Sequence, residues 1–315
     1  MRTLKTSPAA FGLIGLLLIT ALKAPGFYSV ANLRDLTLVT APVLVAAIGM
    51  TLVILLGEID ISIGAQYAVC AILTGIAAKA GLPVPIVALI AMAAGALLGA
   101  INGTLIARFR IPSIVATLAA MMALRDLLRW TTQGAWIQNL PSSFQWAGLG
   151  QSAGALLIVA VALIVFGVFA WALTNLRAGR AVYATGCSPE SARLAGMDPK
   201  QILLAVFALM GMLTGLAAVL GSLRFTDIQS GAGVGLEMKV IAAVVVGGAS
   251  IGGGRASLWG TLLGVILMCT IGTSLTYLGI EAFWEKAVQG AIILASVIVN
   301  ALSGSEKRLA TAAIR

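Results

Sequence analysis

Histidine is absent from the 315 residues of this chain, and charged residues make up only 10% of it. Without histidine, Ser–His and Cys–His catalysis and histidine-dependent zinc or haem sites are excluded. Soluble domains carry about 25% charged residues. The low charge, together with 60% hydrophobic residues, therefore excludes a water-soluble fold.

Cysteine is scarce, and a nucleotide-binding motif is missing. The three cysteines, Cys70, Cys187 and Cys269, lie far apart and match no disulfide framework or metal-ligand spacing. The motif G-x-x-x-x-G-K-[ST], which cradles phosphates, does not occur, so we expect the glycine-rich run 248–255 to form a tight turn. We predict no catalytic residue, no metal site and no cofactor, which makes a membrane enzyme the weakest functional class.

Long uncharged runs dominate the sequence instead. The runs 36–57 and 150–176 each reach the roughly 18 to 20 residues that a bilayer-spanning helix needs. The predicted fold is an all-α membrane protein, a bundle of about ten transmembrane helices. It forms a single transmembrane domain over 1–315 with its core at 36–302. The predicted helices are 8–22, 36–56, 62–78, 84–107, 112–129, 152–175, 201–221, 238–250, 256–279 and 286–302.

The arrangement of small and basic residues adds detail to this bundle. Gly95 and Gly99 have the small-x-x-x-small spacing that lets helices approach closely in lipid. The helices at 62–78 and 238–250 are short and flanked by glycine, so we expect them to line a pathway. Although the net charge is +9, Lys and Arg are scattered between apolar segments. We interpret them as orientation signals that place the N-terminus in the cytoplasm, and expect no nucleic-acid partner.

The longest polar stretch, 176–200, carries signals for a short helix. Ser188 suits the N-cap and Pro189 the first helical position. Gly196 suits a left-handed C-terminus, and Asp198 begins the next membrane helix. We predict a docking helix for a partner protein at the cytoplasmic face. A solvated connecting loop is the alternative.

Two acidic residues follow the first long apolar run. Carboxylates inside a membrane are costly to bury unless they are paired, and they are therefore candidates for function. One interpretation is that Glu58, Asp60 and Ser62 line a translocation pathway. The other is that Asp60 and Ser62 cap the next helix at a bend near the membrane interface.

Four long blocks stand out along the chain. They are ILLGEIDISIGAQ at 54–66, NGTLIARFRIPSIVATLAAMMALRDLLRWTTQGAWI at 102–137, YATGCSPESARLAGMDPKQILLAVFALMGMLTGLAAVL at 183–220 and GAGVGLEMKVIAAVVVGGASIGGGRASLWGTLLGVIL at 231–267. In this order they resemble one family, the sugar-type permeases of ABC importers, which includes ribose, xylose, rhamnose and autoinducer-2 transporters. Glu58 departs from that family's pattern, which usually has a second glycine before I-D.

The resemblance implies a function and a set of partners. The chain would be a transport subunit without its own ATPase site, which moves a sugar or sugar-like solute such as rhamnose, ribose or autoinducer-2 across the bacterial inner membrane. Its partners would be a cytoplasmic ATP-binding subunit, a periplasmic solute-binding protein, a second permease subunit, identical or paralogous, and membrane lipid. The ATPase-coupling helix would comprise Ser188, Pro189, Glu190, Ser191, Ala192, Arg193, Leu194, Ala195, Gly196 and Met197.

A second functional class stays open from the sequence. Broken helices beside a carboxylate near the membrane midplane are typical of secondary transporters. In that alternative, Glu58 or Asp60 would bind a coupling proton or sodium ion.

Overall fold

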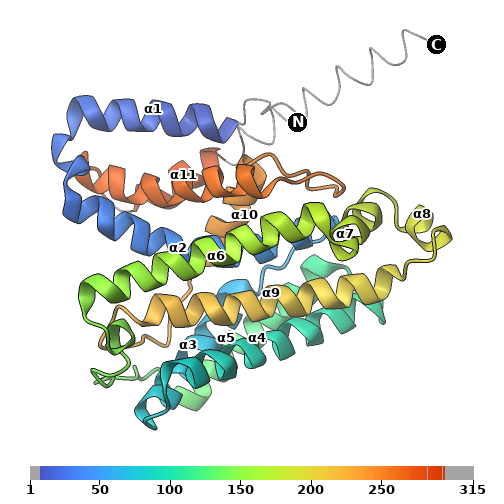
Figure 1. Ribbon diagram of the computed structural model, residues 1–315, viewed down its shortest axis with the longest axis horizontal. Coiled ribbons are helices and arrows are strands. Elements are labelled where there is room, and N and C mark those ends of the chain that lie inside the picture. The colour runs from blue at the N-terminus through green and yellow to red at the C-terminus, as the bar shows by residue number, and fades with distance from the viewer. Residues whose placement is uncertain (1–7, 282, 293, 295–315) are drawn as a thin grey trace.

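The computed structural model describes residues 8–281, 283–292 and 294 (Figure 1). Over these residues the fold is all-α, as predicted, and its only β-type pairing is an isolated antiparallel bridge between Ile137 and Ile228. Short 3₁₀ helices lie at Pro25–Tyr28 and Gln145–Gly148, and residues 284–292 are also helical. The labelled helices are α1 (Pro8–Lys23), α2 (Val30–Leu55), α3 (Ile63–Lys79), α4 (Val84–Ala107), α5 (Ser113–Thr132), α6 (Gln151–Asn175), α7 (Arg177–Cys187), α8 (Pro189–Leu194), α9 (Pro199–Ser222), α10 (Leu236–Val246) and α11 (Leu258–Tyr277).

Five helices in the described part are long and apolar enough to cross a membrane, namely α2, α4, α6, α9 and α11. The predicted total of about ten spans is not confirmed. The two helices expected to be short are short: α3 has 17 residues and α10 has 11. At 1.5 Å per residue α10 extends about 16 Å, roughly half of a bilayer's hydrocarbon core. Of the predicted helix 286–302, residues 286–292 are helical, and residues 293 and 295–302 lie outside the described residues.

Helix α2 occupies the centre of the bundle. Every residue from Ala41 to Leu55 is buried, and α9, α11, α6 and α10 all pack against it. A helix that is hydrophobic on all sides is suited to this position. The apolar run at 36–57 therefore forms the protein's core.

Helices α4 and α9 pack closely together, and glycine makes the approach possible. A Cβ on Gly95 would overlap the carbonyl oxygen of Gly211, and a Cβ on Gly211 would overlap that of Gly95. One turn further along α4, Gly99 lies against the carbonyl of Phe207 in the same way. The close packing predicted from the spacing of Gly95 and Gly99 is confirmed.

The loops gather at two opposite ends of the bundle. At one end, Arg34 donates a hydrogen bond to the carbonyl of Gln151 (2.9 Å), and Trp146 N–H donates to the carbonyl of Leu223 (2.8 Å). Figure 1 shows α7 and α8 at the other end, with α8 projecting beyond the long helices. The polar segment 176–200 is therefore well separated from the loops that surround Trp146.

Candidate functional site

The short helix predicted in the polar segment is α8. Ser188, its N-cap, is extended (φ −161°, ψ 103°) and its side chain accepts a hydrogen bond from the N–H of Ser191 at 3.2 Å. Pro189 occupies the first helical position, as expected. Glu190 and Arg193 form an ion pair of 2.8 Å on the exposed surface. Such a pair adds at most about 1 kcal/mol to stability, so the cap and the proline define where the helix begins.

The segment after α8 is also as predicted. Gly196 has a φ of +81°, a left-handed conformation that glycine adopts without a Cβ clash. Asp198 then caps α9 by accepting hydrogen bonds from the backbone N–H groups of Lys200 and Gln201. The local structure predicted for 188–199 is confirmed. The docking of an ATPase on it stays a prediction.

The surface of α8 combines one buried and one exposed apolar side chain. Ala192 is buried against the rest of the protein, whereas Leu194 is 81% exposed at the end of the helix. A single exposed leucine is common on protein surfaces. Here it lies on the most projecting helix of the structure (Figure 1).

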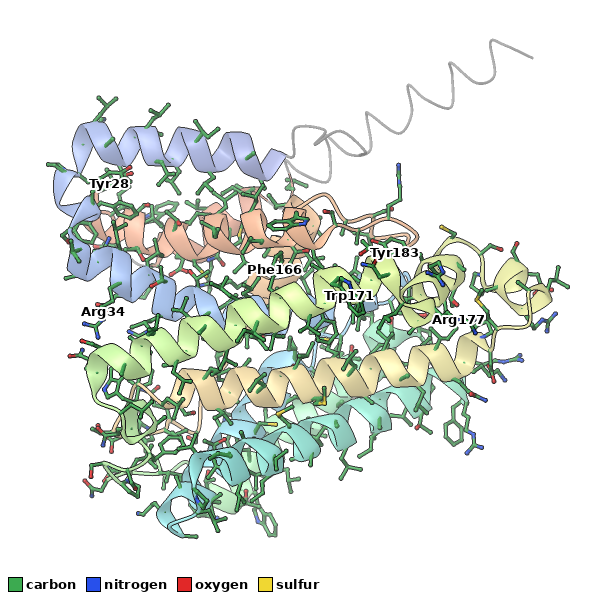
Figure 2. All side chains as sticks on the ribbon, viewed as in Figure 1. Tyr28, Arg34, Phe166, Trp171, Arg177 and Tyr183 are labelled. Atoms are coloured by element: carbon green, nitrogen blue, oxygen red, sulfur yellow. The ribbon has the colours of Figure 1, made fainter. Side chains whose placement is uncertain are left out.

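Helix α7 is not predicted from the sequence, in which 176–187 belongs to the polar stretch expected to form a loop. Its buried residues, Gly179, Val182 and Thr185, are three positions apart and form one face. This spacing is the signal that identifies the helix. Figure 2 shows Arg177 and Tyr183 at this end of the bundle, opposite Tyr28 and Arg34.

Helix α7 packs tightly on the end of α2 and on the loop before α11. A Cβ on Gly186 would overlap the carbonyl oxygen of Leu55, which already accepts a hydrogen bond from Gly254 N–H at 2.9 Å. Tyr183 donates its hydroxyl to the carbonyl of Ala256 at 3.0 Å. Burial raises the pKa of Tyr183, so the phenol stays a neutral donor at physiological pH. These contacts connect the segment that carries α8 to the central helix.

Replacing Gly186 by alanine is expected to loosen α7 from α2, because the added methyl group overlaps the backbone of Leu55. Overpacking of this kind costs about 1–3 kcal/mol, which corresponds to about a 5- to 150-fold increase in the population of the open segment. Trypsin cleavage of the folded protein at basic residues within 176–200 should accelerate accordingly. Gly252→Ala in the neighbouring loop is the control, since its nearest neighbour is 4.0 Å away. Equal cleavage rates in the two variants would contradict the expectation.

The glycine-rich run 248–255 forms the expected tight turn. Gly248, Gly253 and Gly254 have positive φ angles of 95°, 82° and 74°. Ser250 N–H closes the turn by donating to the carbonyl of Arg255 at 2.8 Å. Across the described residues, no group of three or more His, Cys, Asp or Glu side chains is placed to hold a metal ion.

Asp60 and Ser62 belong to a fully buried hydrogen-bond network. Oδ1 of Asp60 accepts from both the N–H (2.8 Å) and the hydroxyl (2.6 Å) of Ser62. Gln66 Nε2 donates to Asp60 Oδ2 (3.1 Å) and to Ser62 Oγ (2.8 Å), and Asn102 Nδ2 also donates to Ser62 Oγ (2.8 Å). Ser62 is the N-cap residue of α3, but its side chain makes no bond to the helix backbone. The network therefore joins α4 to the loop that begins α3.

Glu58 lies apart from this network. It lines a cavity of about 330 Å³ together with Arg110, Thr185, Pro189 and Lys200. This cavity separates the loop after α2 from the segment that carries α8. The structure thus places Asp60 and Ser62 together and puts Glu58 beside the predicted docking segment, while a role in translocation stays a prediction for all three.

A second polar cluster was not singled out from the sequence. Lys239 Nζ lies 3.1 Å from Oε1 of Glu285, and Gln289 Nε2 donates to the same oxygen at 2.8 Å. These side chains line a cavity of about 690 Å³, as does Glu237. Lys239 lies in the short helix expected at 238–250, and Glu237 directly precedes it, so charged residues at the start of that helix were the available signal.

Comparison with known proteins places this geometry in context. Residues 32–297 match the protein family described as "Branched-chain amino acid transport system / permease component". The chain is 33% identical over 296 residues to the ribose import permease protein RbsC of Escherichia coli K12, with 91% of each chain covered. It is 35% identical over 288 residues to the probable ABC transporter permease protein YphD of the same strain, covering 91% of this chain and 86% of YphD.

A third relative is the autoinducer 2 import system permease protein LsrC of Escherichia coli O157:H7. The two are 34% identical over 293 residues, which cover 91% of this chain and 85% of LsrC. No solved structure matches the chain significantly.

Proposed function

This chain belongs to the permease family of sugar-importing ABC transporters, and from that premise we propose that it carries a neutral sugar or sugar-like solute into the cytoplasm. It is a multi-pass membrane protein, as the family and its five long apolar helices indicate. We place it in the bacterial inner membrane. The relatives named for ribose and autoinducer 2 support a small polyhydroxylated solute, and rhamnose belongs to the same chemical class.

The observation that carries this proposal is the capped helix α8. It projects from one end of the bundle, and its segment packs against the end of the central helix α2 through Gly186 and Leu55. A cytoplasmic ATP-binding subunit docked on residues 188–197 would be mechanically connected to the core. ATP binding shifts the bundle between two conformations only if the docked contacts differ between them, and this segment is where such contacts would act.

The remaining partners follow from the transport cycle. A periplasmic solute-binding protein would deliver the solute to the opposite end of the bundle, near the loops around Trp146. A second permease subunit, identical or paralogous, would complete the pathway, and lipid would surround both. Glu58, Asp60 and Ser62 stay our predicted pathway residues, with the buried network around Asp60 fixing the start of α3.

The comparisons give no support to an ion-coupled secondary transporter. Reconstitution in liposomes separates the two functions. The chain together with a cognate ATP-binding subunit and solute-binding protein should accumulate radiolabelled D-ribose, L-rhamnose or autoinducer 2 only when ATP is supplied on the ATPase side. Accumulation by the chain alone under a proton or sodium gradient would contradict the proposal.

A further inference from the structure

The largest cavity described above lies between the first turns of α10, Val43 of α2 and the helical residues 284–290. Its volume of about 690 Å³ falls within the roughly 300–1,000 Å³ that is typical of small-molecule sites. Val43, Met238 and Phe283 form the apolar part of the cavity lining. The polar side chains project from α10 and from the segment 284–290.

The charged groups that line the cavity balance one another. Glu237 and Glu285 are acidic, whereas Lys239 and Lys286 are basic, so two negative and two positive charges leave a formal charge of zero. A cavity with an excess of either sign would favour a solute of the opposite sign. This cavity therefore suits a neutral solute.

The hydrogen-bonding groups are only partly used within the protein. The bonds from Lys239 and Gln289 both end on Oε1 of Glu285. An ammonium group has three donors and a carboxylate has two acceptor oxygens, so both groups can bind further partners. Glu237 accepts from Gly235 N–H through Oε1 at 3.1 Å, whereas its Oε2 is buried against Gly64, on the side of Arg125, and is not open to the cavity.

We infer that this cavity is a binding site for a neutral, polyhydroxylated solute, in which Lys239, Glu285 and Gln289 contact the solute's hydroxyl groups. Neighbouring hydroxyls act as both donor and acceptor, and the ion pair presents both kinds of partner side by side. The aromatic ring of Phe283, which is 89% exposed at the open side of the cavity, offers an apolar surface for the C–H face of a sugar ring. The inference rests on the proposed function and adds to it the residues that meet the solute.

The test uses the complete complex with its ATP-binding subunit and solute-binding protein in liposomes. Radiolabelled D-ribose, D-xylose and L-rhamnose are the probes, and uptake is divided by the ATP hydrolysed. Lys239→Gln and Glu285→Gln should each lower this ratio about tenfold or more, because each removes a charged hydrogen-bonding partner of the solute. The amount of assembled complex should not change. Glu281→Gln is the control, since Glu281 is exposed and does not line the cavity.

The outcomes separate this inference from the function on which it rests. If the wild-type complex transports none of these sugars and no autoinducer 2, the proposed function fails. If it transports and both variants keep the wild-type ratio, the binding site is wrong while the function stands. If the single variants fail to assemble, the double variant Lys239→Glu with Glu285→Lys, which reverses the ion pair, distinguishes solute binding from a purely structural role. Restored assembly with low uptake per ATP supports the site, and full uptake shows an ion pair that only holds the helices together.

Discussion

Replacing Leu194 by glutamate is expected to abolish ATP-driven uptake while leaving the bundle folded. Leu194 is 81% exposed at the end of α8, so the change breaks no packing within the chain. In a docked complex the same side chain would be desolvated, and buried apolar anchors at interface centres contribute about 2 kcal/mol or more. A glutamate there would also bring an unpaired charge into the interface. Co-purification of the ATP-binding subunit should therefore fall about thirtyfold or more.

The control for Leu194 is an equally simple surface change far from α8. Leu149 is 57% exposed, and it lies beside Trp146 at the opposite end of the bundle. Leu149→Glu should leave the amount of co-purified ATPase subunit unchanged. Should Leu194→Glu retain that subunit at the wild-type level, α8 is not the docking helix.

The parts of the structure that the sequence predicted share a physical cause. Helix existence, the ends of α8 and the close approach of α4 and α9 depend on local rules: apolar run length, capping side chains and small residues one turn apart. Ser188 and Gly196 act through backbone geometry within a few positions of themselves, and the spacing of Gly95 and Gly99 marks the packing face of α4 without naming the distant helix that packs on it. Such signals survive in a single sequence because they need no knowledge of distant contacts.

The parts that escaped prediction depend on contacts between distant segments. Glu58 and Asp60 are two residues apart, yet the fold directs one to a cavity beside Lys200 and the other into a network with Asn102. The pairing of Lys239 with Glu285 likewise joins residues far apart in the chain. Composition indicated that these charges were unusual in apolar helices, but only the packing of α10 against the segment 284–290 shows which partners they have.

Two substitutions of Asp60 distinguish a structural role of its buried network from a role in translocation. Asp60→Ala would remove the acceptor for the Ser62 N–H, the Ser62 hydroxyl and Gln66 Nε2 in a site where all these groups are buried. Leaving a buried donor unsatisfied costs about 1–3 kcal/mol each, so we expect a loss of at least about 3 kcal/mol in the free energy of unfolding. Thermal unfolding in detergent should show a much lower midpoint and little folded protein.

Asp60→Asn is the matched variant, because it keeps the acceptor that faces Ser62. Rotation of the Gln66 amide would turn its Oε1, which has no partner among the described residues, toward the new N–H₂ group, in exchange for the bond from Gln66 Nε2 to Ser62 Oγ. We therefore expect the asparagine variant to fold nearly as well as the wild type. If its ATP-driven uptake is also retained, Asp60 acts by holding α3 and α4 together. A folded Asp60→Asn protein that transports no solute would instead assign the carboxylate charge to the translocation pathway.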